Sequence, residues 1–525
     1  MNTHYEYLIL GAGAAGLQMA YCLEQAGRSY RVLEAGDGPG TFFKQYPRHR
    51  KLISINKVHT GFDDREKNLR WDWNSLLCDD EALQFKHYSQ RYWPGADDLV
   101  RYLTDFASHF DLNVRYATEA ACIARSRDGF SVTDAEGNAY TSQRLIVATG
   151  VRTPYVPPIP GIELCENYSS VDVDPQTFVN QRALILGKGN SAFEIAELLT
   201  ETTAMIHVCS PNPIKMAWAT HHVGHLRAVN NNFLDSYQLK TQNAVLDAQV
   251  RSVTRRGGQL VATMAYAHAD GEVEEIVYDR IIVCTGFRMD VQPFAPSAKP
   301  QLCIHDRFPA QTSSWESVNV PGMYFAGTLM QARDFKKTSS GFIHGFRYNV
   351  RALFQLLEQR HHGRRLPSRC IAPTAQACTE AVLATVNRSS ALWQQFGFLA
   401  DLMQIEPDGE VRIQTALPVD HIHDTLTVGM RDYFLVTLEY GSHKARDPFQ
   451  IQRPDSRDAG RAEQSSFLHP VVRHCRDGQV LAEQHLMEHL ETDWTQTYHV
   501  EPLRAFFERT LPEAVECRQS LLAMA

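Results

Sequence analysis

Three glycines close to the start of the chain have the spacing of a loop that binds a dinucleotide. Gly11, Gly13 and Gly16 follow the apolar, β-rich run Tyr5–Leu10 and precede a helical pattern over Ala14–Ala26. The first glycine permits a sharp turn, the second lets backbone N–H groups approach a pyrophosphate, and the third lets the helix pack closely on the strand. The N-terminus of that helix adds partial positive charge for the phosphates.

An acidic residue ends the second predicted strand, Tyr30–Glu34. A carboxylate at this place accepts hydrogen bonds from a ribose 2′-hydroxyl, and it repels a 2′-phosphate. Glu34 therefore favours FAD or NAD over NADP at this first site. The residues expected to bind that cofactor are Gly11, Gly13, Ala14, Ala15, Gly16, Glu34 and Ala35.

A second glycine loop occurs farther along the chain. Gly187 and Gly189 lie between the predicted strand Ala183–Leu186 and a helical pattern. No acidic residue closes the next strand, Met205–Val208, which runs into Cys209–Pro213. A small-residue glycine loop without the acid suits a second dinucleotide, by elimination a nicotinamide cofactor. The residues expected to bind it are Gly187, Gly189, Asn190 and Ser191.

Length and composition limit the class of protein. Domains usually run about 100–200 residues, so a chain of 525 residues is expected to hold two or three. The net charge of −8 argues against a nucleic-acid partner. No apolar stretch is long enough for a membrane helix, and the first residues carry no secretory signal. A cytoplasmic location without membrane attachment is therefore expected.

Cysteine and histidine patterns predict no metal site. The eleven cysteines are scattered and form no Cys-x-x-Cys pair, so neither a zinc knuckle nor a redox dithiol is indicated. His221, His222 and His225 have no carboxylate or cysteine partners at ligand spacing. We expect reduced, mostly buried thiols.

The elements that must position both loops repeat on either side of a linker. Pro154, Pro157, Pro158 and Pro160 continue neither a sheet nor a helix and mark that linker. We expect an α/β fold with two Rossmann-like dinucleotide-binding domains and a C-terminal α+β domain. The expected boundaries are 1–155 together with 282–370 for the FAD-binding domain, 156–281 for the NAD(P)H-binding domain, and 371–525 for the C-terminal domain.

Two such domains with strands ending in Ala-Thr-Gly and Cys-Thr-Gly resemble the flavoproteins that have two dinucleotide-binding domains. In that group Leu145–Gly150 and Ile281–Gly286 would connect the domains. Its disulfide reductases need a redox dithiol beside the flavin, which this sequence lacks, so oxygen is the expected electron acceptor. The resemblance adds to the cofactor-binding residues Thr149, Gly150, Thr285, Gly286 and Gly327.

The second loop, with Asp279 before a strand ending in Thr-Gly-Phe, resembles the flavin-containing (class B) monooxygenases. Longer segments resemble the FAD-dependent oxidoreductase domain-containing protein 2 family over nearly the whole chain. These segments are Tyr46–Lys57, Asp72–Leu77, Trp218–His221, Gly341–Tyr348, Phe467–Pro470 and Thr492–Trp494. The resemblance implies a monooxygenase that uses FAD, NADPH or NADH, and O2 to oxidise a small organic substrate through a C4a-(hydro)peroxyflavin.

The chain also departs from these families. Ile162, Leu164 and Tyr168 stand where the monooxygenase fingerprint has phenylalanine, glycine and histidine, so Baeyer–Villiger and typical amine or sulfide oxidation are not implied. Pro211–Pro213 occupies the place where relatives carry arginines for a 2′-phosphate, and Lys215 is the nearby cation. The choice between NADPH and NADH stays open.

The resemblance also implies residues at the flavin. Asn56 would lie near the flavin N5, and Arg50 and Lys57 would raise the positive potential around reduced flavin. Gly341–Arg347 is expected to begin a helix facing the flavin N1–C2=O edge, which brings in Phe342 and His344. The alternatives are a loop-capping asparagine, a solvated basic loop and plain helix initiation.

Two other functions are compatible with the same sequence. The first is a single-component flavin-dependent halogenase of an aromatic substrate. The second is a non-oxygenase flavoprotein that serves as an electron-transfer or protein-binding scaffold, with Phe467–Pro470, Trp494 and Tyr498 as its surface. Substrate choice is expected to depend on the loop-rich stretch Gly36–Trp93 and on the C-terminal domain. The sequence carries no signal for an oligomeric state.

Overall fold

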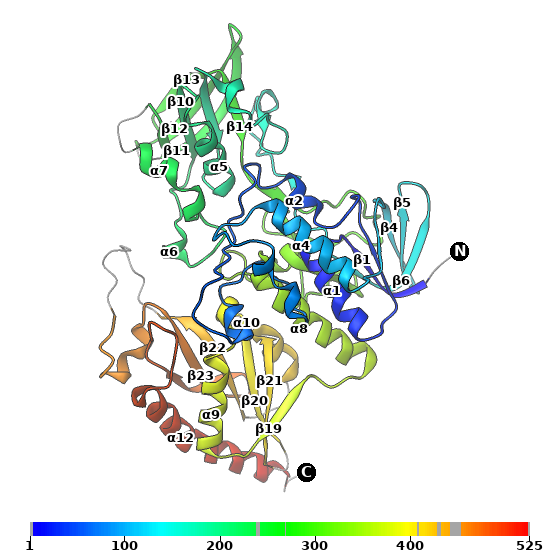
Figure 1. Ribbon diagram of the computed structural model, residues 1–525, viewed down its shortest axis with the longest axis vertical. Coiled ribbons are helices and arrows are strands. Elements are labelled where there is room, and N and C mark those ends of the chain that lie inside the picture. The colour runs from blue at the N-terminus through cyan, green and yellow to red at the C-terminus, as the bar shows by residue number, and fades with distance from the viewer. Residues whose placement is uncertain are drawn as a thin grey trace.

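The computed structural model describes residues 4–237, 242–267, 269–406, 409–427, 432–441 and 453–522. Three sheets form the centres of three domains, which Figure 1 shows stacked along the long axis of the molecule. The second domain lies at one end, the third at the other, and the first between and beside them. No described helix is long and apolar enough to cross a membrane.

The first domain is built on a sheet in the order β3-β2-β1-β6-β5-β4, with β18 paired to β6. Strands β1, β2, β3, β6 and β18 run parallel, whereas β5 and β4 complete an antiparallel meander. The bounds are β1 (His4–Leu10), β2 (Tyr30–Leu33), β3 (Val114–Arg115), β4 (Ala120–Ser126), β5 (Gly129–Asp134), β6 (Ala139–Val147) and β18 (Met323–Phe325).

Alternating side chains of β1 divide the core of this domain. Tyr7 and Ile9 face the helices, and Leu8 and Leu10 pack on the other face with the segment that precedes β18. This alternation is the period of a strand buried on both sides. The covering helices are α1 (Ala14–Gln25), α4 (Ala96–His109) and α8 (Ile343–His362).

The second domain repeats the plan in the order β13-β12-β11-β10-β9-β14-β8. Its strands from β8 to β11 are parallel, and β12 and β13 form an antiparallel extension. The bounds are β8 (Glu166–Asn167), β9 (Arg182–Leu186), β10 (Met205–Ser210), β11 (Ala244–Arg256), β12 (Gln259–Tyr266), β13 (Val273–Tyr278) and β14 (Arg280–Val283), with helices α5 (Asn190–Leu199), α6 (Ala217–Thr220) and α7 (Asn232–Tyr237).

The chain passes between these two domains twice, and the two connecting segments lie side by side. β7 (Thr153–Pro154) pairs antiparallel with β15 (Phe287–Arg288). β14 belongs to the second sheet as far as Val283, so the return crossing lies a few residues beyond the expected boundary at 281/282. Asp279 separates β13 from β14, and its carboxylate accepts a hydrogen bond from the Arg182 backbone N–H.

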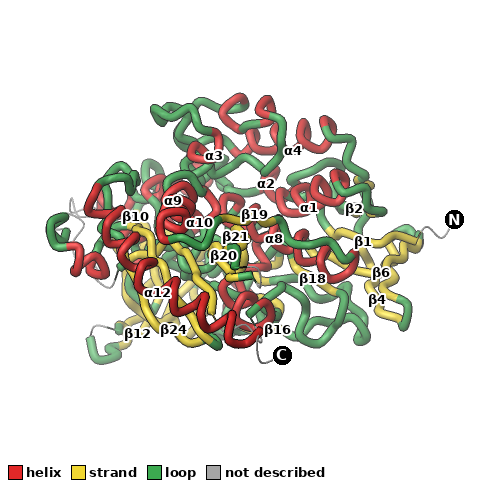
Figure 2. Tube along the Cα trace, turned by 90° about the horizontal axis from the view of Figure 1, so that it is seen from below, coloured by secondary structure: helices red, strands yellow, loops and turns green. Residues whose placement is uncertain are grey.

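The third domain is an antiparallel sheet in the order β19-β21-β20-β22-β23-β24, and it begins with β19 at Ser368 rather than at residue 371. One sheet face packs on α9 and α12, and the other packs on α8, which lies between α1 and this sheet in both views (Figures 1 and 2). The bounds are β19 (Ser368–Ile371), β20 (Leu399–Ile405), β21 (Val411–Pro418), β22 (Asp432–Tyr440), β23 (Leu468–Arg476), β24 (Gln479–His485), α9 (Ala375–Val386), α10 (Ser390–Gln394) and α12 (Thr497–Leu522).

Candidate active site

The carboxyl ends of four parallel strands meet at one edge of the first sheet. β1 ends before Gly11, β2 before Glu34, β6 before the Ala148–Gly150 turn, and β18 before Gly327. Backbone hydrogen bonds hold this edge, from the Gly11 N–H to the Leu33 carbonyl at 2.8 Å and from Ala148 to Leu10 at 2.9 Å. In doubly wound folds, ligands bind outside the carboxyl ends of the strands. The predicted residues of the first site therefore lie together.

The first glycine loop has the shape that a pyrophosphate requires. Gly11 has φ of 99°, and a Cβ there would lie 2.9 Å from the Ala148 carbonyl oxygen. A Cβ on Gly16 would lie 1.9 Å from the Gly11 carbonyl oxygen, so any other residue would push α1 away from the turn. Gly13 precedes α1, and a Cβ added there would have no atom within 4 Å, so the space in front of the helix N-terminus is open. These residues fit a bound dinucleotide.

Glu34 forms hydrogen bonds with three segments of this site. Its carboxylate accepts hydrogen bonds from the Ala12 N–H at 2.6 Å, from the Gly36 N–H at 2.8 Å and from the Thr41 hydroxyl at 3.0 Å. The residue is 7% exposed. One lone pair of the oxygen that faces Ala12 stays available for a ribose hydroxyl, because that oxygen accepts a single protein hydrogen bond. Ala14 and Ala15 follow in the first turn of α1.

The second glycine loop has the same backbone frame. The Gly187 N–H donates to Cys209 at 2.8 Å, and the Cys284 N–H donates to Leu186 at 2.8 Å. Gly187 has φ of 124°, and a Cβ added to Gly189 would have no atom within 4 Å. Thr285 and Gly286 hold the linker through hydrogen bonds with the Tyr155 backbone.

Side chains around the second loop differ from those around the first. Buried Ala192 takes the third position, which α1 reserves for glycine. Ser210 takes the place of Glu34, and its hydroxyl donates to the Asn212 carbonyl. Lys188 forms an ion pair with Asp247 and is nearly inaccessible to solvent. The loop therefore presents no carboxylate at the ribose position.

Asn190 holds the segment 224–230 of the second domain in place through four hydrogen bonds. Its amide nitrogen donates to the carbonyls of Gly224 and His225, at 3.2 and 3.1 Å. Its amide oxygen accepts from the Arg227 N–H at 3.0 Å and from Asn230. Ser191, the next predicted residue, lies beside Tyr168. Asn190 thus shapes this loop, whichever ligand the second domain binds.

A buried carboxylate joins the two dinucleotide domains. Glu194 on α5 accepts hydrogen bonds from the His49 N–H at 3.0 Å and from the Tyr168 hydroxyl at 3.2 Å. The His49 ring lies 2.9 Å from the Asn230 side-chain oxygen. Burial raises the pKa of Glu194 to about 7, and burial lowers the pKa of His49. Below we call Glu194, His49 and Tyr168 the domain junction.

The three residues predicted to be catalytic have separate surroundings. Asn56 is buried, and its amide nitrogen donates to the carbonyls of Ser89 at 2.7 Å and Arg91 at 3.3 Å. Arg50 forms an ion pair with Asp97, and Lys57 is exposed. No hydrogen bond or ion pair within the described part of the chain joins the three.

The start of α8 presents an unpaired imidazole. Phe342 precedes the helix, and His344 lies in its first turn, 1% exposed. The His344 ring stacks on Trp73 at 4.1 Å, and neither ring nitrogen has a hydrogen-bond partner among the described residues. Burial lowers the pKa of His344 well below its usual value, so the ring is neutral. A buried polar side chain without partners marks a place where a bound molecule supplies them.

The sequence predicted His344, but it did not predict the side chains that the second and third domains contribute to this region. The Arg227 guanidinium of the second domain lies over the Trp73 ring at 5.3 Å. Tyr440 of the third domain stacks on His221 at 3.7 Å, close to α6, which Figure 1 shows between these two domains. Loop residues of this kind carry no spacing signal in a single sequence.

Gln395 of the third domain supports the segment that leads into α8. Its side-chain oxygen accepts hydrogen bonds from the Ser339 N–H at 3.2 Å and the Thr338 hydroxyl at 3.1 Å. Its nitrogen donates to Ser340 and Asn349, each at 2.8 Å. The residue is fully buried. The third domain is therefore part of the structure that positions His344.

Comparison with known proteins agrees with this architecture. Residues 8–327 match the family described as pyridine nucleotide-disulphide oxidoreductase. The chain is 38% identical to FAD-dependent oxidoreductase domain-containing protein 2 of Mus musculus, over 97% of this chain and 84% of that one. It is 24% identical to senecionine N-oxygenase of Tyria jacobaeae, over 61% of this chain and 66% of that one.

A solved structure has the same fold in its first two domains. The flavin-containing monooxygenase from Stenotrophomonas maltophilia matches 68% of this chain and 98% of its own, with 18% identity and a TM-score of 0.51. The cofactors are thus FAD and a nicotinamide dinucleotide, and the α/β fold with two dinucleotide domains is confirmed. The chain belongs to the pyridine nucleotide-disulphide oxidoreductase family, as a flavin-dependent oxidoreductase related to FAD-dependent oxidoreductase domain-containing protein 2.

Proposed function

We propose that the protein is a monooxygenase that uses NADPH or NADH and O2 to oxidise a small organic substrate through a C4a-(hydro)peroxyflavin. The single observation that carries this proposal is the buried, unpaired His344 imidazole at the start of α8, stacked on Trp73. A buried, neutral imidazole beside a helix N-terminus suits oxygen chemistry at a flavin, because a buried site excludes water from a reactive intermediate.

The proposal assigns the nicotinamide dinucleotide to the second loop and FAD to the first. When bound, FAD accepts a hydride and passes electrons to oxygen. The α8 N-terminus would stabilise negative charge on the reduced ring system. In this proposal FAD is bound by Gly11, Gly13, Ala14, Ala15, Gly16, Glu34, Ala35, Thr149, Gly150, Gly327, Phe342 and His344, and the nicotinamide cofactor by Gly187, Gly189, Asn190, Ser191, Thr285 and Gly286.

Asn56, Arg50 and Lys57 stay the predicted catalytic residues. Because the Asn56 amide nitrogen is held by Ser89 and Arg91, donation to a flavin oxygen adduct requires that side chain to rotate. The absence of a redox dithiol supports oxygen as the acceptor. The sequence has no Cys-x-x-Cys pair, and each cysteine whose side chain the structure describes, from Cys22 to Cys475, is free.

The reaction of the reduced flavin with O2, followed without other steps of the catalytic cycle, tests this proposal. Enzyme reduced without oxygen is mixed with O2 in a stopped-flow spectrometer, and a transient spectrum distinct from reduced and oxidised flavin is expected. Labelled O2 should then place one oxygen atom in the product of an active substrate, found by screening amino acids, indoles and phenols. Direct reoxidation with stoichiometric peroxide in the presence of that substrate would contradict the proposal. A brominated product in the presence of bromide would identify a halogenase instead.

A further inference from the structure

A hollow of about 340 Å³ lies beside the middle of β6, away from the carboxyl ends of the strands that lead into the glycine loop. The β4–β5 hairpin, the middle of β6, the start of β18 and the last turn of α8 line it. Predicted FAD residues follow the carboxyl ends of β6 and β18, and His344 lies at the other end of α8. The hollow is therefore separate from the candidate active site.

Arginines dominate the lining of this hollow. Arg125, Arg127, Arg144 and Arg360 line it, against two carboxylates, Asp128 and Glu316. The remaining charge of the hollow is positive, although the whole chain carries a net charge of −8. Clustered positive charge on an acidic protein raises the local concentration of anions.

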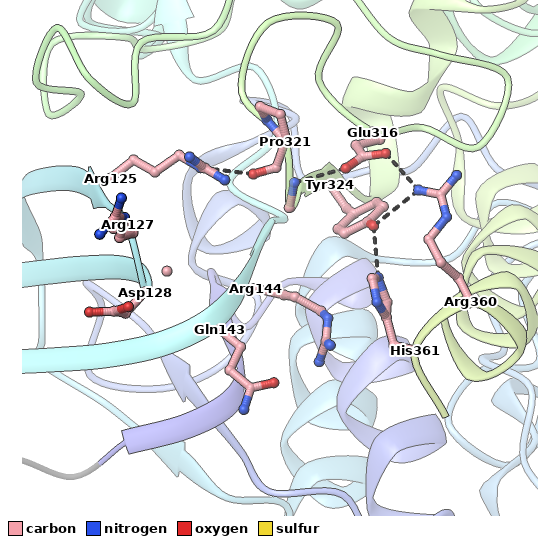
Figure 3. A pocket seen from close by; sticks show the side chains of 12 residues that line it. Arg125, Arg127, Asp128, Gln143, Arg144, Glu316, Pro321, Tyr324, Arg360 and His361 are labelled. Atoms are coloured by element: carbon pink, nitrogen blue, oxygen red, sulfur yellow. Dashed lines mark hydrogen bonds and ion pairs between the residues drawn. The ribbon is translucent and has the colours of Figure 1, made fainter. Parts of the chain in front are cut away.

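Only one of these arginines has a carboxylate partner among the described residues. Arg360 pairs with Glu316 at 2.6 Å, as Figure 3 shows. Arg125 donates to the Pro321 carbonyl at 2.9 Å, and Arg127 on the exposed hairpin pairs with no described residue. The Arg144 side chain donates no hydrogen bond to a described residue, and its Nη1 is shielded from solvent without a partner.

Fixed polar groups form the floor between the arginines. The Tyr324 hydroxyl lies 3.0 Å from His361 Nε2 and 3.4 Å from Arg360 Nη1, so it joins two lining residues (Figure 3). The Arg144 guanidinium lies over the Tyr7 ring at 5.2 Å, which restricts its direction. Burial lowers the pKa of His361 to about 4, so this ring is neutral near pH 7. The arginines therefore supply the positive charge of the hollow.

We propose that this hollow binds the phosphate group of a small organic phosphate, at a site distinct from both dinucleotide sites. Guanidinium groups match phosphate oxygens with paired N–H donors. A phosphate group carries close to two negative charges near neutral pH, whereas a carboxylate ligand carries one. A phosphate therefore matches the charge of three arginines without carboxylate partners better than a carboxylate ligand does. The volume lies in the range of small-molecule sites.

Inorganic pyrophosphate is the probe that tests this site. FAD-loaded enzyme is first saturated with its nicotinamide dinucleotide, so that both dinucleotide sites are filled, and pyrophosphate is titrated by calorimetry. We expect saturable binding by the wild type and at least a tenfold weaker Kd for Arg144→Gln and for Arg127→Gln. Arg127 is exposed, so its replacement leaves folding unchanged. Flavin content checks the fold of each variant.

Arg251→Gln is the matched control, because Arg251 is an exposed arginine of β11, outside the hollow, with no ion pair to a described residue. Its Kd should equal that of the wild type. Equal affinity in all four proteins, or binding that vanishes once the nicotinamide cofactor is present, would overturn the proposal. Binding of an acidic peptide but not of pyrophosphate would also overturn it and would assign the hollow to a protein partner.

Discussion

The two glycine loops share a backbone frame and differ in how tightly the chain closes around it. In both, the first glycine donates to the end of the neighbouring strand at 2.8 Å. At the first loop, Gly16 leaves no room for a Cβ, and Glu34 ties the loop to Thr41. At the second loop, Ala192 fills the equivalent position, and Ser210 stands in place of the carboxylate.

The two loops show how one fold can serve two kinds of ligand. A helix that touches its turn, fixed by a buried carboxylate, suits a cofactor that stays bound. A loop with a side chain between helix and turn, and no fixed acid, suits a cofactor that exchanges in each catalytic cycle. We infer that Gly16 and Glu34 retain FAD, whereas Ala192 and Ser210 allow the nicotinamide dinucleotide to leave.

The largest effect is expected from Gly16→Ala. The new Cβ would lie 1.9 Å from the Gly11 carbonyl oxygen, so α1 must move. Overpacking of this kind costs roughly 1–3 kcal/mol, and purified protein should contain little flavin. The ratio of flavin absorbance to protein measures this directly. Ala192→Gly is the matched change at the second loop, and it should retain full flavin content with a loss of about 0.5–1 kcal/mol.

The loops were predictable from sequence, because their chemistry depends on residues close together in the chain. Gly11 and Glu34 are set by spacing along two adjacent strands. The roles of Gln395 and Arg227 were not predictable from sequence. They come from other domains and contact Ser339 and Trp73, through loops whose direction depends on packing. The third domain was expected as a separate unit, yet α8 packs on its sheet and joins it to the first domain.

Glu34→Gln tests the role of the acid at the first loop. Both oxygens of the Glu34 carboxylate accept hydrogen bonds, from Ala12 on one side and from Gly36 and Thr41 on the other. The amide NH2 group of glutamine would face the donors on one of these sides, and a buried donor there would lose its acceptor. Such a loss costs about 1–3 kcal/mol, so FAD affinity should fall by roughly ten- to a hundredfold. Titration of apoprotein with FAD measures it. Ser210→Ala should leave FAD affinity unchanged, and an equal effect of both variants would contradict the assignment of the loops.

Ser210→Glu sharpens the same comparison from the other side. A carboxylate at the ribose position repels a 2′-phosphate and favours a free 2′-hydroxyl. We expect the KM for NADPH to rise by about tenfold relative to the KM for NADH, with flavin content unchanged. Steady-state oxidation of both dinucleotides provides the measurement. A change confined to FAD binding would show that the loops have been assigned in reverse.

A further difference concerns pH at the domain junction. Burial raises the pKa of Glu194 from 4.5 to about 7, so the folded protein holds a proton that the unfolded chain releases at lower pH. Stability from this group is therefore greatest below about pH 4.5 and is lost as pH rises toward 7. Relative to Glu194→Gln, the wild type should lose about 1 kcal/mol per pH unit between pH 5 and 7.

Thermal unfolding of both proteins across this pH range measures the slope. Glu197→Gln, one turn along α5 at a part-exposed position, is the control and should follow the wild type. Parallel profiles for wild type and Glu194→Gln would show that the junction carboxylate titrates normally.

A nicotinamide dinucleotide bound at the second loop is expected to reduce the FAD that is held at the first loop. The most direct test mixes FAD-loaded enzyme with NADPH or NADH in the absence of oxygen and follows the visible flavin absorbance. We expect one or both dinucleotides to bleach the flavin. We also expect that a Gly189→Glu variant, which puts a negative side chain into the open space at the start of α5, keeps its flavin but is reduced at least tenfold more slowly. A flavin that stays oxidised with both dinucleotides, or equal reduction rates in wild type and variant, would contradict this assignment of the two loops.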